Sequence, residues 1–137
     1  MRLWDYKILP YLPKSQLLSQ KRECDLIWKD ISNGKQTNHI LINYMWEYDI
    51  EDFVIYYCML QDEFKRRNFN FNSNTYFNML FWAREFNLKK TPFEKHHTNR
   101  YLIQCFFNLQ EKYERGQKDF SLDVYTKLKK FIEEDIL

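Results

Sequence analysis

The scarcity of glycine and proline is the feature that most constrains the fold of this chain. Its 137 residues include only two glycines and three prolines. Sandwiches and barrels need many tight turns, and these two residues supply most of them. Aromatic residues make up 19% of the sequence, and no stretch has low complexity. The composition therefore predicts an all-α fold, with residues 1–137 forming a single compact domain.

Apolar spacing predicts about five helices. The first is expected from about Lys14 to Ser32, because Pro13 precedes it and Asn33-Gly34 supplies an end signal. The others are expected over 50–67 with Asp49 as N-cap, over 75–86, over 98–113, and after a Ser121 cap. The side chains expected to face the core are Leu17, Cys24, Trp28 and Ile31; Phe53, Tyr57, Leu60 and Phe64; Tyr76, Phe77, Leu80 and Phe81; Tyr101, Leu102, Cys105, Phe106 and Leu109; and Leu122, Tyr125, Leu128 and Ile132.

Several classes of protein are disfavoured by what the sequence lacks. No apolar run approaches the ~18 residues that cross a bilayer, and the first residues lack the apolar region of a signal peptide. We therefore expect a soluble, cytoplasmic protein. The cysteines Cys24, Cys58 and Cys105 are far apart in apolar positions, which favours reduced core thiols. The three histidines have no cysteine or acidic partner at ligand spacing, so we expect no metal site.

Charge gives a weak indication of a nucleic-acid partner. The formal net charge is only +2, but residues 1–35 hold seven basic residues against four acidic ones. Further basic clusters lie at 65–67, 89–90 and 127–130. Ordinary solvated helix faces explain each cluster equally well. The distribution of charge is therefore compatible with DNA binding without establishing it.

The amino terminus is a candidate nucleophile. An α-amine has an ordinary pKa of about 7.7 to 8.0, so a neutral fraction that can form an imine exists near pH 7. The bulky Arg2 should prevent removal of the initiator, which leaves the free amine on Met1. Glu23 is expected at the edge of the apolar face of the first helix, partly desolvated, with Arg22 nearer to solvent. An Arg-Glu pair in a helix is most often a surface salt bridge, so spacing alone does not assign this chemistry.

Several short segments together resemble one known family. They are Met1-Arg2-Leu3-Trp4, Leu12-Pro13-Lys14, Gln16-Leu17-Leu18, Arg22-Glu23, Asn43-Tyr44 and Lys65-Arg66-Arg67. In these segments the chain resembles the phage-type pyrimidine-dimer DNA glycosylases and their small bacterial relatives. The resemblance covers residues 1 to about 70 and continues more weakly through Pro92, His97, Tyr101 and Leu102.

The resemblance implies a DNA glycosylase with abasic-site lyase activity. It places Met1 at the nucleophile that forms a Schiff base and Glu23 at the catalytic carboxylate, with no metal or cofactor. The implied partner is double-stranded DNA with a damaged or modified base, bound by a monomer. The expected DNA contacts are Arg2, Lys21, Arg22, Lys35, His39 and Tyr44. Tyr44 belongs to the polar and aromatic connection 35–48, where an aromatic ring could stack on a base.

The sequence also departs from the phage pattern. Gln16 and Leu26 stand where the phage enzyme has a histidine and an arginine, and residues 131–137 do not match its aromatic tail. The expected substrate is therefore a pyrimidine dimer or another damaged base. Two alternatives stay open at this point. One is a nucleic-acid-binding domain of the same fold without turnover, and the other is a helical protein-interaction module. The structural alternative to a functional role is core packing for Tyr44. For His97 it is a position at the start of a helix.

Overall fold

The computed structural model describes residues 1–71, 75, 78–79 and 90–137. Its α-helices are α1 (Lys14–Ser32), α2 (Ile50–Arg66), α4 (Asn99–Glu114) and α5 (Leu122–Phe131). Two 3-10 helices, η1 (Tyr6–Tyr11) and η2 (Asn43–Glu47), and a π-helical turn, η3 (Ile132–Ile136), complete the described elements. No strand occurs among the described residues, and the all-α prediction is confirmed. The helix expected over 75–86 falls mostly outside the described residues, as do its core positions Tyr76, Phe77, Leu80 and Phe81.

Local signals in the sequence set both ends of α1. Pro13 lies directly before the helix, as predicted. At the other end Gly34 has φ +70, and its N–H donates to the Ile31 carbonyl at 3.1 Å. The N–H of Lys35 donates to the Asp30 carbonyl at 2.8 Å. This pair of bonds is a Schellman motif, which glycine permits because it adopts positive φ without steric cost. The motif ends α1 and directs the chain into the connection 35–48.

Helix α2 is the most deeply buried helix of the described part. The predicted core residues Phe53, Tyr57, Leu60 and Phe64 are all at most 1% exposed. Asp49 occupies the N-cap position as expected, but its side chain makes no capping hydrogen bond. The acidic Glu51 and Asp52 in the first turn suit the positive dipole at this end of the helix instead.

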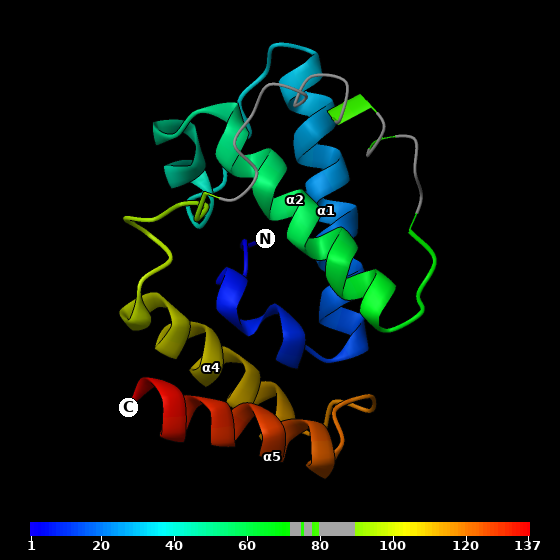
Figure 1. Cartoon of the computed structure of the whole chain (residues 1–137), viewed down its shortest axis with the longest axis vertical. Coiled ribbons are helices and arrows are strands. Elements are labelled where there is room, and N and C mark those ends of the chain that lie inside the picture. Colours follow the sequence, from blue (N-terminus) through cyan, green and yellow to red (C-terminus); the bar gives the residue numbers. More distant parts are fainter. Residues whose placement is uncertain (72–74, 76–77, 80–89) are drawn as a thin grey trace.

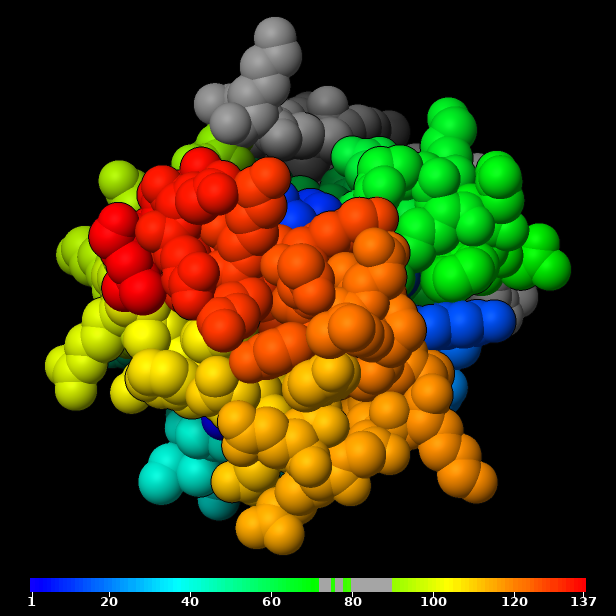
Figure 2. All heavy atoms as spheres, turned by 90° about the horizontal axis from the view of Figure 1, so that it is seen from below, coloured from blue at the N-terminus to red at the C-terminus, as the bar shows by residue number. Residues whose placement is uncertain are grey.

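The helices form two groups with the N-terminal segment between them. In Figure 1, α1 and α2 lie together on one side of the blue N-terminal segment, and α4 and α5 lie together on the other. η1 contacts α2, α4 and α5. Seen from below (Figure 2), the yellow-to-red helices cover most of the face, and only small parts of the blue segment are visible. One apolar cluster runs from Leu3 to Ile132, so a single core joins both groups.

One core prediction on α5 is wrong. Leu122 is 67% exposed, because it is the first residue of α5 and follows the Ser121 cap, whose hydroxyl accepts from the N–H of Val124 at 3.2 Å. Leu128 and Ile132 are buried as expected. The prediction of reduced core thiols is confirmed, because all three cysteines are free and none is exposed. No helix in the described part of the chain is long and apolar enough to cross a membrane.

Candidate active site

A hollow of about 340 Å³ lies where the N-terminus meets α1. Its size is within the range of small-ligand sites. The connection before η2 and the later part of α4 complete its walls. Its main lining residues are Met1, Arg2, Trp4, Ser19, Glu23 and Leu41, with Gln16, Asn108 and Lys112 at further positions. The structure therefore brings together three of the residues singled out from the sequence: Met1, Arg2 and Glu23.

Glu23 is half-buried, and its surroundings shift the pKa of its carboxyl group in opposite directions. Burial raises the pKa of its carboxyl group, because desolvation disfavours the charged form. The positive charge of the Met1 amine lowers this pKa, and the charges of Arg22 and His39 lower it to a smaller extent. The amine is thus close enough to Glu23 to influence its ionisation. A partly desolvated carboxylate beside an amine is suited to proton transfer.

The side-chain amide of Gln20 links the first residues of the chain to Glu23. Its Nε2 donates to the Arg2 carbonyl oxygen at 3.0 Å and to Glu23 Oε2 at 3.1 Å. Its Oε1 accepts from the Trp4 N–H at 2.7 Å and lies 2.8 Å from the Tyr56 hydroxyl. A backbone N–H can only donate, so it fixes the orientation of the amide. Gln20 is fully buried, and sequence reasoning missed it.

Side chains from other helices hold residues 2–4 as well. The Tyr101 hydroxyl on α4 donates to the Leu3 carbonyl at 2.5 Å, and the Tyr56 hydroxyl on α2 lies 2.7 Å from the Trp4 carbonyl. The Arg2 guanidinium lies over the rings of Trp4 and Tyr101, at 5.5 and 6.0 Å from their centroids. The backbone that carries Met1 is therefore fixed by α1, α2 and α4 together.

A buried histidine lies next to this segment. His97 is 3% exposed, its Nδ1 accepts from the Tyr6 N–H at 3.2 Å, and its Nε2 lies 2.7 Å from the Tyr44 hydroxyl. Burial lowers the pKa of His97 to about 3, with Lys7 and His96 acting in the same direction. The ring is neutral at ordinary pH. Because Nδ1 is an acceptor, Nε2 carries the proton and donates to Tyr44.

Tyr44 is engaged inside the protein. Besides the bond from His97, its ring stacks on that of His96 with centroids 4.7 Å apart. The side chain is half-buried and packs against the apolar core. Its expected contact with DNA stays a prediction, and these interactions indicate that it also shapes the connection beside the hollow.

The four other expected DNA contacts differ in their surroundings. Lys21 is 7% exposed and pairs with Asp25 at 2.6 Å, so its charge is compensated within the protein. Arg22 is exposed and donates to the Ser19 hydroxyl at 2.9 Å. His39 is exposed, and its charge acts on Glu23. Lys35 is exposed just after α1 and does not line the hollow.

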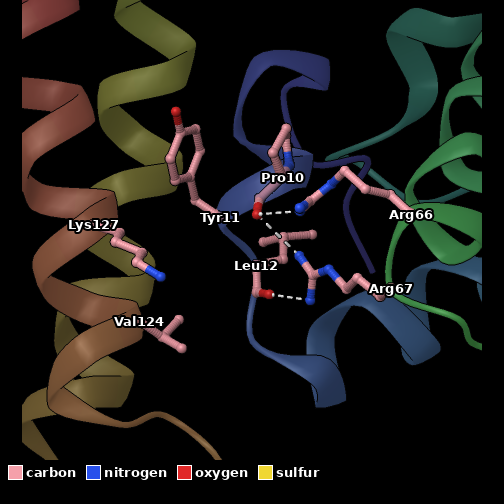
Figure 3. Close-up of a pocket in the computed structure, with 7 residues that line it drawn as sticks. All are labelled: Pro10, Tyr11, Leu12, Arg66, Arg67, Val124 and Lys127. Atoms are coloured by element: carbon pink, nitrogen blue, oxygen red, sulfur yellow. Dashed lines mark hydrogen bonds between the residues drawn. The ribbon is translucent and has the colours of Figure 1, made fainter.

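A second hollow of about 340 Å³ contains part of the basic cluster at 65–67 (Figure 3). Arg67 donates to the carbonyl oxygens of Leu9, Pro10 and Leu12 at 3.2, 3.1 and 2.8 Å. Arg66 and Arg67 also pair with Glu63. These bonds attach the end of α2 to η1. The two arginines are thus engaged within the fold, and neither Met1 nor Glu23 lies in this hollow.

No metal centre is evident in the part of the chain that the structure describes. Among those residues, no group of three or more His, Cys, Asp and Glu side chains could hold a metal ion. The ionisable groups that line the first hollow among the described residues are the Met1 amine, Arg2, Glu23 and Lys112.

Comparison with known families identifies the family to which this helical chain belongs. The family model for pyrimidine dimer DNA glycosylases matches residues 1–77, which is more than half of the chain. The protein belongs to this family, as the sequence resemblance predicted. The match includes Met1, Arg2 and Glu23 but ends before α4. No curated protein and no solved structure matches the chain.

Proposed function

We propose that the protein is a DNA glycosylase with abasic-site lyase activity, acting through the Met1 α-amine with Glu23 as its acid-base partner. The observation that carries the proposal is the shared hollow, in which the charge of the amine acts on the half-buried carboxyl group of Glu23. Membership of the family supplies the class of substrate, DNA with a damaged or modified base. A pyrimidine dimer is the first candidate lesion.

The first stage is replacement of the damaged base by the amine. The neutral amine nitrogen attacks C1′ of the target nucleotide, and the bond between C1′ and the base breaks. The base leaves with the bonding electrons and takes up a proton. The nitrogen then loses a proton, the bond between C1′ and O4′ opens with protonation of O4′, and a protonated imine joins Met1 to C1′. The carboxylate of Glu23 stabilises the positive charge that develops at C1′.

The second stage is strand cleavage. Glu23 removes a proton from C2′, the C2′ electrons form a double bond toward C1′, and the imine nitrogen accepts the displaced pair. Elimination then breaks the bond between C3′ and its phosphate oxygen. Water hydrolyses the resulting imine and restores the free amine. Each stage needs a proton acceptor or donor beside the nitrogen, and Glu23 is the carboxyl group that lines the hollow with Met1.

Basic side chains around the hollow are suited to the DNA backbone. Arg2 lines the hollow, and the charges of Arg22 and His39 lower the pKa of Glu23. A nucleophile that attacks C1′ must approach within reach of the adjacent phosphates, where cations bind favourably. We propose Arg2, Arg22 and His39 as phosphate contacts. Lys21, Lys35 and Tyr44 stay predicted contacts, and Lys21 also pairs with Asp25 on α1.

Analysis of the product ends tests the proposed reaction. A duplex with one abasic site is incubated with the protein in the presence of a chelator, and the fragments are analysed by mass spectrometry. β-Elimination should leave an unsaturated aldehyde at the 3′ end and a phosphate at the 5′ end. A 3′-hydroxyl end would show hydrolytic cleavage of the phosphodiester and would contradict the proposal. Uncleaved abasic DNA would contradict it as well.

A further inference from the structure

A tight turn beside the hollow exposes two large apolar side chains at its corner. The N–H of Ile42 donates to the His39 carbonyl at 3.0 Å, which places Ile40 and Leu41 at the two central positions. Ile40 is 89% exposed and Leu41 is 47% exposed. Such positions usually hold Gly, Pro, Asn, Asp or Ser, which satisfy the turn backbone or tolerate solvent. An isoleucine and a leucine there are not explained by the needs of the turn.

The base of this turn is firmly held. Ile42 is completely buried in the core, and its carbonyl accepts from the Met45 N–H at 2.9 Å. On the other side the Trp46 indole donates to the Thr37 carbonyl at 3.1 Å. The two corner side chains therefore extend from a fixed support.

The corner adjoins the proposed site. Leu41 lines the same hollow as Met1 and Glu23, and the charge of the neighbouring His39 acts on Glu23. Leu26, one turn after Arg22 on α1, is also 57% exposed. Exposed apolar side chains thus occur at the hollow itself and, on α1, one turn from the basic Arg22. Cations bind the phosphates at the edges of duplex DNA, and exposed apolar side chains can enter the stack of bases between them. The surface beside the hollow therefore suits duplex DNA as a partner.

We propose that Ile40 and Leu41 form a wedge that inserts between base pairs beside the target nucleotide. The proposal rests on the proposed function. An amine that is fixed in a hollow can reach C1′ of the target only where the duplex beside that nucleotide is bent or opened. Apolar side chains that enter a base step open it and kink the duplex. Insertion at the corner would open the duplex directly beside Leu41, the residue that the wedge shares with the wall of the hollow.

Unstacking can be measured apart from catalysis. The probe is a duplex that carries a tetrahydrofuran abasic analogue, which cannot form an imine, with 2-aminopurine as the neighbouring base. At saturating protein, the unmodified chain should raise 2-aminopurine fluorescence several-fold. Ile40→Ser should lose most of this rise while still binding, and Ile40→Leu should retain it. Leu122→Ser changes a leucine on α5 that is 67% exposed and does not line the hollow, and it should behave as the unmodified chain.

Cleavage provides a second readout. For Ile40→Ser, the ratio of cleavage rates on duplex and single-stranded abasic DNA should fall by about tenfold, because only the duplex needs to be opened. Ile40→Lys separates insertion from affinity. The added cation should tighten duplex binding, yet the fluorescence rise should be lost as in Ile40→Ser. Ile40 is 89% exposed and lies outside the described core cluster, and thermal melting of each variant verifies the fold.

The outcomes distinguish this proposal from the proposed function. An unaltered fluorescence rise and an unaltered rate ratio in Ile40→Ser would overturn the wedge while leaving the amine chemistry intact. Equal losses on duplex and single-stranded DNA would also overturn it, because they would indicate a general contact. If the unmodified protein neither bound nor cleaved abasic DNA, the proposed function and the wedge would both be wrong.

Discussion

Gln20 donates a hydrogen bond of 3.1 Å to Glu23 Oε2 from the same nitrogen that donates to the carbonyl of Arg2 at 3.0 Å. One buried amide therefore fixes the carboxylate relative to the backbone that carries Met1. The two side chains are three positions apart on α1, where neighbours on one helix face meet. This contact gives the proposed amine and its acid-base partner a common support.

We expect Gln20→Met to impair both the site and the fold. Methionine fills a similar volume but leaves the Trp4 N–H and the Arg2 carbonyl without their partner, so the free energy of unfolding should fall by about 2 to 4 kcal/mol. Removal of a donor to the charged form should also raise the pKa of Glu23. The acid limb of the pH-rate profile for cleavage should therefore move to higher pH. Urea unfolding and rate profiles measure the two effects. A variant that is destabilised but keeps the pH profile would limit Gln20 to a structural role.

Glu23→Gln should preserve duplex affinity while lowering cleavage by about 10² to 10⁴-fold, the usual contribution of a positioned acid-base group. Because burial raises the pKa of Glu23, the unmodified protein should lose activity on acidification above the ordinary glutamate value. Rates on abasic duplex and binding by anisotropy test this prediction. Glu133→Gln, at an exposed position of η3, is the matched control. Normal cleavage by Glu23→Gln would exclude the assigned role.

His97 should make the stability of the protein depend on pH. Its pKa is about 3 in the folded chain and about 6.5 when unfolded, so the unfolded state binds more protons between these values. The free energy of unfolding should therefore decrease as pH falls from about 6.5 toward 3, by up to about 1.4 kcal/mol per pH unit. His97→Asn retains an acceptor for the Tyr6 N–H but does not titrate there. Denaturant unfolding across this range should show a smaller slope for the variant, and an identical slope would contradict the assignment.

Arg22→Ala should weaken DNA binding at all sequences and reduce the slope of log K against log salt by about 0.9, the value for one lost phosphate contact. Lys127→Ala is the control, because Lys127 pairs with Asp123 on α5 and lines a different hollow. Titrations at several salt concentrations give both slopes. Equal changes in the two variants would indicate diffuse attraction by a basic surface.

Local signals allowed much of the fold to be predicted. Pro13 and Asn33-Gly34 identify the ends of α1, because proline, glycine and backbone hydrogen bonds act within a few residues. Leu122 was assigned to the core by its spacing, yet the first turn of α5 extends beyond the core. The expected helix over 75–86 lies mostly outside the described residues.

The support of the site could not be predicted in the same way. Gln20 contacts Tyr56 across 36 positions, and His97 contacts Tyr6 across 91. The spacing of apolar residues in the sequence does not predict either contact. Lys21 stays a predicted DNA contact, and it also pairs with Asp25, a partner four positions away that spacing alone could have suggested. Resemblance to the family, rather than pattern, identified Met1 and Glu23 as candidates.

Borohydride trapping of the imine tests the central proposal most directly. Protein with its native amino terminus is mixed with abasic duplex and sodium borohydride, and the cross-linked product is digested and analysed by mass spectrometry. The proposal predicts one DNA adduct on the α-amine of Met1, with no adduct when two residues are added before Met1. An adduct on an internal lysine, or equal trapping and cleavage by the extended protein, would contradict the assignment of Met1 as the nucleophile.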